Sequence, residues 1–100
     1  MSSKKSNRQK EFNYFTTVVE KHIENYTVPQ YGDAPDDQVE AWTPEQCMDS
    51  IKRYANRFKT NRRGRIETLR DMVKIAHYTC LIFCKINPTG EEIEKIIKGE

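Results

Sequence analysis

The strongest constraint on the fold is a long helical pattern between residues 65 and 86. One apolar row, spaced 3, 4, 3, 4, 3, consists of Ile66, Leu69, Val73, Ala76, Cys80 and Phe83. A second row beside it consists of Met72, Ile75, Thr79, Ile82 and Ile86. Two adjoining rows are wider than the apolar stripe of an ordinary surface helix. The pattern therefore predicts a helix that lies at the centre of the fold or packs against another subunit.

The rest of the chain predicts two more main helices and a short one. Apolar residues recur at helical spacing over residues 9–26. A capping box at Thr43–Gln46, with proline at the first helical position, indicates a helix over 44–59. A second capping box at Thr89–Glu92 indicates a short helix over 91–98. No strand-like alternation occurs. We therefore expect an all-α fold, an antiparallel bundle of three main helices plus a short C-terminal helix.

The helices are separated by clear breaks. Pro29 and Gly32 interrupt the first helical pattern, so residues 27–42 are expected to form a long connection. Asn87-Pro88 is expected to end the long helix. The length of 100 residues fits one domain. We expect a flexible basic tail over 1–8 and a single helical domain over 9–100.

The chain shows no sign of export or of a membrane span. Its N-terminus lacks the apolar core of a signal peptide, and no apolar run approaches about 18 residues. The three cysteines are an odd number and have helical surroundings, which favours reduced thiols over a disulfide framework. We therefore expect a cytoplasmic protein, in a bacterial cell or a phage-infected host, without a membrane partner.

Positive charge is concentrated around the turn between the second and third predicted helices. Residues 52–74 contain nine Lys and Arg against two acids, Glu67 and Asp71. Guanidinium groups bind phosphate oxygens in pairs, and a turn that opens a helix adds backbone N–H donors. The candidate phosphate-binding residues are Arg53, Arg57, Lys59, Arg62, Arg63 and Lys74. The alternative is a solvated basic face that balances the acidic stretch 33–49.

Two pairs of carboxylates have the spacing of one helical turn. Glu20 and Glu24 lie on the first predicted helix, and Glu67 and Asp71 lie on the third. If those helices pack side by side, the four acids could hold Mg²⁺, which prefers oxygen ligands and can align a phosphate for attack by water. The alternative is that Glu67 and Asp71 pair with nearby arginines or Lys74, while the other pair faces solvent.

Aromatic residues near the basic turn offer a second kind of contact. Tyr54 and Tyr78 could stack on a nucleobase, although anchoring in the core is the more common role. Sequence-specific DNA binding is disfavoured, because the helix after the basic turn is too apolar to lie in a groove. The chain contains no P-loop motif and no glycine-rich dinucleotide loop.

Residues 51–78 resemble a pattern in small phage and prophage proteins, including a nucleotide-kinase-like family of largely unknown function. The matching positions are Arg53, Tyr54, Arg57, Lys59, Glu67, Asp71, Lys74 and Tyr78. The family usually has Asp-Leu-x-Lys-Ala where this chain has Asp71-Met72-Val73-Lys74-Ile75. The acid pairs are also similar to those of the all-α nucleotide pyrophosphohydrolases of the MazG type. That family has ExxE and ExxD spacings where this chain has ExxxE and ExxxD, so no catalytic role is assigned from it.

Together these features lead to one hypothesis and two alternatives. The leading hypothesis is a small phage-type helical protein that binds a nucleotide or another phosphorylated small molecule and forms a homo-oligomer. The first alternative is a Mg²⁺-dependent nucleotide hydrolase or phosphotransferase that uses Glu67 and Asp71. The second is a non-enzymatic interaction or inhibitor protein that docks on a protein partner.

Overall fold

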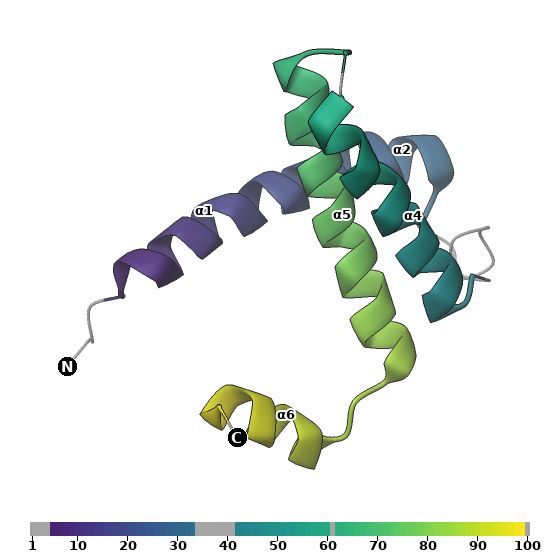
Figure 1. Cartoon of the computed structure of the whole chain (residues 1–100). Helices are drawn as coiled ribbons and strands as arrows, with labels where there is room; N and C mark the ends of the chain where they lie inside the picture. The colour runs from purple at the N-terminus through teal and green to yellow at the C-terminus, as the bar shows by residue number, and fades with distance from the viewer. Residues whose placement is uncertain (1–4, 34–41, 61, 100) are drawn as a thin grey trace. The chain divides into compact units, whose positions relative to one another are not determined.

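A computed structural model describes residues 5–33, 42–60 and 62–99 of the chain. Within these ranges the structure consists of helices and turns, and none of the described residues forms a strand (Figure 1). The predicted all-α class is confirmed, with three main helices, α1, α4 and α5, and the shorter α6. The chain divides into two units, Met1–Ala41 and Trp42–Glu100, and each is described by itself. The expectation of a single helical domain over 9–100 stays a prediction.

The first unit is one nearly continuous helical rod. Helix α1, Asn7–His22, begins two residues earlier than predicted, because the Ser6 hydroxyl caps it by accepting a hydrogen bond from the Gln9 backbone N–H at 3.1 Å. Asn7 and Arg8, expected in the basic tail, are therefore helical. The rod continues through a π-helical turn, η1 (Ile23–Thr27), into α2, Val28–Tyr31.

Pro29 does not break this rod, contrary to the sequence-based prediction. Proline lacks an N–H and crowds the carbonyl one turn before it, which normally ends an α-helix. Here the wider turn of η1 comes first, and the Val28 N–H donates to the Ile23 carbonyl five residues back. Pro29 then occupies the first turn of α2, where its missing N–H is tolerated. The rod ends at Gly32, whose φ of +84° suits glycine; residues 34–41 of the expected connection lie outside the described ranges.

The second unit is built on a helical hairpin. Helix α4, Pro44–Arg57, begins with the predicted capping box, in which Thr43 and Gln46 exchange hydrogen bonds of 3.2 and 2.8 Å. It tightens into a short 3₁₀ turn, η2 (Phe58–Thr60), and the chain then reverses into α5, Arg65–Ile86, at the predicted bounds. Helices α4 and α5 pack against each other and run in opposite directions (Figure 1). Gly64, with φ +97°, makes the entry to α5.

The core of this hairpin is small and partly polar. On α4 the buried residues are Cys47 and Ser50, and on α5 they are Asp71 and Val73. Several members of the predicted apolar rows of α5 remain exposed, including Ile66, Leu69, Phe83 and Ile86. Within this unit, α5 is covered by α4 on one side, and part of its predicted apolar surface stays exposed. The expected homo-oligomer stays a prediction.

The last helix, α6, spans Gly90–Lys98. Asn87 ends α5 in the left-handed conformation, with φ +59°, as the Asn87-Pro88 sequence predicts. The capping box of α6 is also present, with hydrogen bonds of 3.1 and 2.9 Å between Thr89 and Glu92. Among the helices of the described ranges, none is long and apolar enough to cross a membrane.

Candidate functional site

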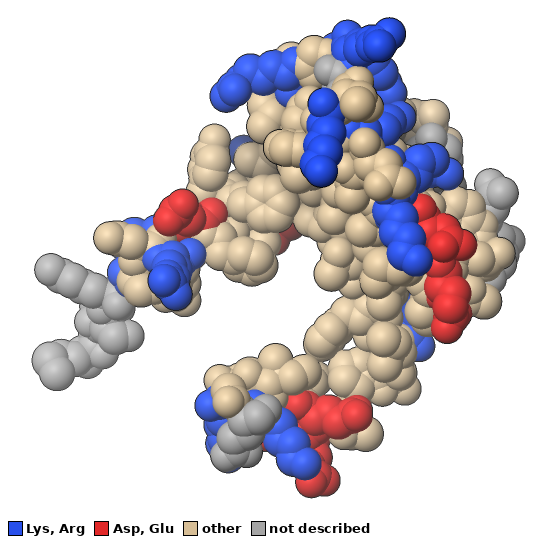
Figure 2. Space-filling view, viewed as in Figure 1, with Lys and Arg blue, Asp and Glu red and all other residues tan. Residues whose placement is uncertain are grey.

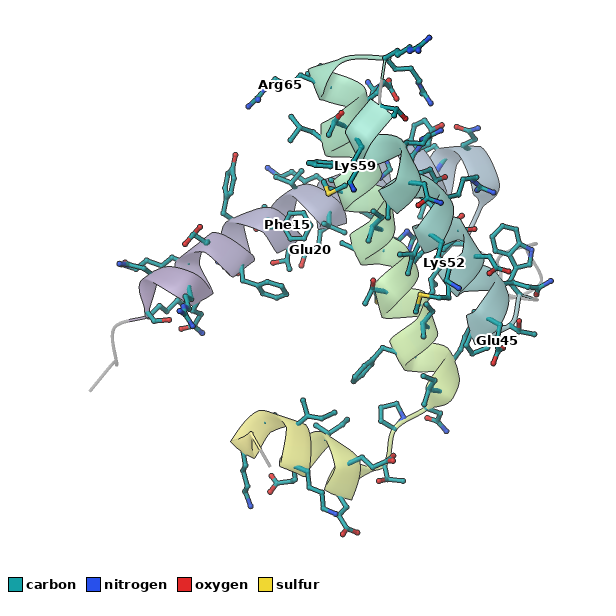
Figure 3. All side chains as sticks on the ribbon, viewed as in Figure 1. Phe15, Glu20, Glu45, Lys52, Lys59 and Arg65 are labelled. Atoms are coloured by element: carbon teal, nitrogen blue, oxygen red, sulfur yellow. The ribbon has the colours of Figure 1, made fainter. Side chains whose placement is uncertain are left out.

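The strongest concentration of charge lies where α4 leads into α5. We call residues 52–74 the basic end of the hairpin; they carry nine Lys and Arg against two carboxylates. Figure 2 shows blue side chains gathered around the turn between α4 and α5, and Figure 3 labels Lys59 and Arg65 there and Lys52 farther along α4. Glu45 marks the opposite end of α4 in the same view. The hairpin is therefore electrically polarised along its length.

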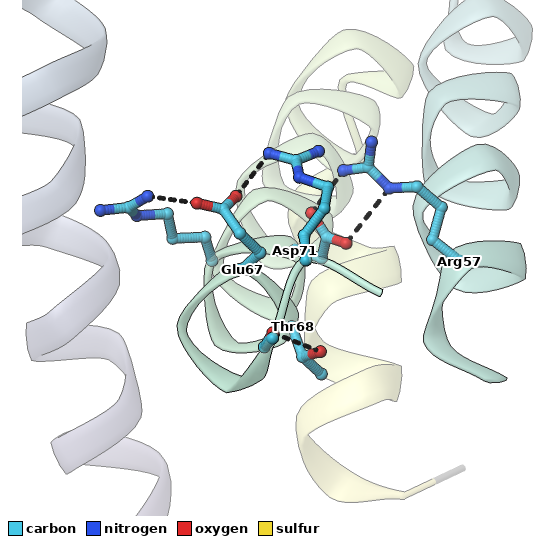
Figure 4. Close-up of polar contacts among 7 residues, drawn as sticks. Arg57, Glu67, Thr68 and Asp71 are labelled. Atoms are coloured by element: carbon cyan, nitrogen blue, oxygen red, sulfur yellow. Dashed lines mark hydrogen bonds and ion pairs between the residues drawn. The ribbon is translucent and has the colours of Figure 1, made fainter. Parts of the chain in front are cut away.

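One carboxylate of the basic end is buried in an ion pair that joins the two helices. Asp71 of α5 is only 1% exposed, and Arg57 of α4 donates to both of its oxygens, at 2.7 and 3.3 Å (Figure 4). The hydrogen bonds that Arg57 donates to Asp71 raise the pKa of Arg57 above its usual value, against the smaller effect of desolvation. The sequence foresaw a local partner for Asp71, whereas the observed partner lies 14 residues away. Arg57 is therefore a fixed cation that also fastens α4 to α5.

The other carboxylate bridges two arginines on the surface of the turn. Glu67 accepts hydrogen bonds from Arg63 at 2.6 Å and from Arg70 on its other oxygen. This local pairing is the alternative that the sequence offered to a metal site. Glu20 and Glu24 are exposed in the first unit. Among the described residues no group of three or more His, Cys, Asp or Glu is placed to hold a metal ion, and the magnesium hypothesis stays a prediction.

The two tyrosines proposed for base stacking are engaged inside the hairpin. Cations of Arg53, Arg57 and Lys74 lie 5.3, 4.9 and 5.6 Å from the centre of the Tyr54 ring. The centre of the Tyr78 ring lies 6.1 Å from the ring centre of Trp42 and 6.1 Å from that of Tyr54. Arg53 and Lys74, two of the proposed phosphate ligands, are thus held beside an aromatic ladder between the helices.

The burial of Tyr78 gives the hairpin a predicted sensitivity to alkali. Burial, together with the neighbouring Tyr54, raises the pKa of Tyr78 above its ordinary value of 10.0, although a hydrogen bond with Ser50 opposes the shift. A group whose pKa is higher in the folded state than in the unfolded state contributes stability at a pH below its unfolded-state pKa. That stability is lost as the pH rises through its folded-state pKa. The free energy of unfolding should therefore fall above about pH 10. The urea-unfolding midpoint of Tyr78→Phe should fall less steeply with pH than that of the unaltered protein. The midpoint of Tyr14→Phe, which alters an exposed residue, should fall as steeply as that of the unaltered protein. Equal slopes for all three proteins would contradict this assignment.

Three exposed cations lie at the tip of the hairpin. Lys59, Arg62 and Arg65 are exposed, and none of them forms an ion pair with a carboxylate in the described ranges. Lys59 belongs to η2, Arg62 to the turn and Arg65 to the first turn of α5, which has no side-chain cap. Arg65 was not among the predicted phosphate ligands. Its position next to Gly64 in the turn was the available signal.

One aromatic residue of the basic end lies outside the hairpin core. The sequence places Phe58 on the apolar row of α4, after Tyr54. In the structure its side chain is 60% exposed, because α4 gives way to the 3₁₀ turn at this residue and the helical row ends. Phe58 lies between Arg57 and Lys59 in the chain, so the exposed residue is flanked in sequence by two cations.

Comparison of the chain with protein-family models, with curated proteins and with solved structures gave no match.

Proposed function

We propose that this protein binds a phosphorylated ligand through the basic end of the α4–α5 hairpin. The observation that carries the proposal is the surplus of positive charge there. Residues 52–74 contain nine cations and two carboxylates, an excess of seven, and each carboxylate is already paired with at least one arginine. A surface with one dominant sign of charge attracts anions and raises their rate of association.

Five of the nine cations of the basic end fall into two groups with different roles. Arg57 and Arg63 are held by carboxylates, so they act as fixed charges that set the local field. Lys59, Arg62 and Arg65 are exposed and can contact phosphate oxygens directly. Guanidinium groups do so in bidentate fashion, and lysine does so as a point charge. We assign direct binding to this second group, which we call the tip cations.

The same contacts favour binding over turnover. A magnesium-dependent reaction at these acids would require Glu67 to leave two arginines and Asp71 to leave a buried ion pair. A metal ion that bound Asp71 would have to displace Arg57 from a carboxylate that is only 2% exposed. Self-association remains part of the proposal, and the exposed Ile86, Ile96 and Ile97 support it.

A thermal-shift series tests the proposal. The probes are inorganic phosphate, pyrophosphate, ATP and an oligonucleotide, each with and without Mg²⁺. At equal probe concentrations the rise in melting temperature should increase with the number of phosphates, and at roughly ten times the dissociation constant of a probe it should be about 8 °C. The triple variant Lys59→Gln/Arg62→Gln/Arg65→Gln should lose most of this rise. No shift with any phosphate-bearing probe at millimolar concentration would refute the proposal.

A further inference from the structure

The basic end combines exposed cations with an exposed aromatic ring. The Phe58 side chain is 60% exposed, although a phenyl ring gains free energy when it leaves water. Its neighbours in the chain are Arg57 and Lys59, and the exposed Arg62 follows η2 closely. A phenyl ring in this setting offers an apolar face beside groups that attract phosphates.

The other aromatics of this region cannot take the same role without breaking internal contacts. Tyr54 has three cations near its ring, and the Tyr78 ring is stacked on Trp42 and tilted against Tyr54. Tyr78 is also only partly exposed, which further reduces the access of a base to its faces. Phe58 is therefore the ring of the basic end that is best placed to meet a ligand.

The cations themselves favour a ligand with several separated phosphates. The tip cations come from three successive parts of the backbone: Lys59 from η2, Arg62 from the turn and Arg65 from α5. All three are exposed. A chain of phosphodiesters can contact such dispersed charges in turn, and it gains affinity from the counterions released at each contact.

We propose that the phosphorylated ligand is a single-stranded nucleic acid, with Phe58 stacking on a base and the tip cations contacting the phosphates on either side. This inference rests on the function proposed above. Single strands expose the faces of their bases, which stack on aromatic side chains without regard to sequence. In a duplex the bases lie inside the stack, so Phe58 would have no base to meet. Stacking without regard to base sequence also agrees with the amino-acid sequence, which disfavours sequence-specific DNA binding.

Fluorescence anisotropy with matched probes tests this proposal. The probes are a labelled single-stranded DNA of about 20 nucleotides, an RNA of the same sequence, and the corresponding DNA duplex. We expect both single strands to bind more tightly than the duplex. Phe58→Leu should weaken single-strand binding by roughly tenfold, because it keeps apolar bulk but removes the ring. Phe58→Trp should retain binding, and Phe58→Leu should leave duplex binding unchanged.

The outcomes separate the two proposals. If Phe58→Leu binds single strands as well as the unaltered protein does, or if the duplex binds best, the single-strand proposal is overturned while phosphate binding stands. If none of these probes and no smaller phosphate ligand binds, both proposals fail. Melting temperatures of the Phe58 variants control for folding, and retained binding by Phe58→Trp identifies the ring as the cause. A preference between DNA and RNA would identify which single strand the site meets.

Discussion

Arg57→Met is expected to destabilise the hairpin far more than Asp71→Asn, although both remove the same ion pair. Asp71 has 2% of its side chain exposed, whereas Arg57 has 34% exposed. When the carboxylate is neutralised, the arginine can turn toward water. When the arginine is removed, the carboxylate remains buried without a partner. The destabilisation therefore depends on which partner is removed.

The expected loss is large for a chain of this size. We expect Arg57→Met to lower the melting temperature by about 15 °C, and Asp71→Asn to lower it by about 5 °C. The double variant Arg57→Met/Asp71→Leu should recover most of the loss, because it removes both charges and keeps apolar volume between the helices. Circular dichroism at 222 nm follows all three transitions.

An exposed ion pair of the same chain provides the control. Lys98 and Glu94 form a surface pair of 3.0 Å on α6, with 60% and 64% of their side chains exposed. Lys98→Met should change the melting temperature by no more than about 2 °C, because solvated pairs contribute little. If Arg57→Met is as mild as this control, Asp71 is not held by Arg57 in solution, and the packing of α4 on α5 would need a different explanation.

The helices were predictable because their ends carry local signals. The capping boxes at Thr43 and Thr89, and the sequence Asn87-Pro88, set helix boundaries through hydrogen bonds within three or four residues. Such signals do not depend on the rest of the fold. Pro29 misled the prediction because a π-helical turn upstream moved the hydrogen bonds by one residue. A sequence pattern with a period of 3.6 cannot show such a local widening.

The composition of the basic end was predictable, but its internal contacts were not. The pairing of Glu67 with Arg63 follows from a spacing of one helical turn, which the sequence displays. The pairing of Asp71 with Arg57 depends on how α4 and α5 are aligned, and no local spacing sets that register. The same alignment brings Tyr78 against Tyr54, so the two predicted stacking residues contact each other. The exposure of Phe58 depends on where α4 tightens into η2.

The second prediction with a large expected effect concerns the salt dependence of single-strand binding. Binding of a single strand releases counterions, and the logarithm of the association constant falls with the logarithm of salt concentration by about 0.7 for each neutralised phosphate. If Lys59, Arg62 and Arg65 each neutralise one phosphate, their replacement by glutamine should make this slope shallower by about 2. At roughly 0.1 M salt the triple variant should bind at least about tenfold more weakly. Anisotropy titrations at four or more salt concentrations measure both quantities.

Net charge alone would also weaken binding, so the control must change charge equally at another place. The triple variant takes the formal charge from +2 to −1, and Lys85→Gln/Lys95→Gln/Lys98→Gln does the same. Helix α5 has 22 residues and is about 33 Å long. Helix α6 and its three-residue connection together span roughly 24 Å, too little to bring Lys95 or Lys98 back to the first turn of α5. The control variant should therefore keep the slope of the unaltered protein. If both variants lose the same slope, the ligand responds to the overall charge of the chain, and the tip cations are not the binding site.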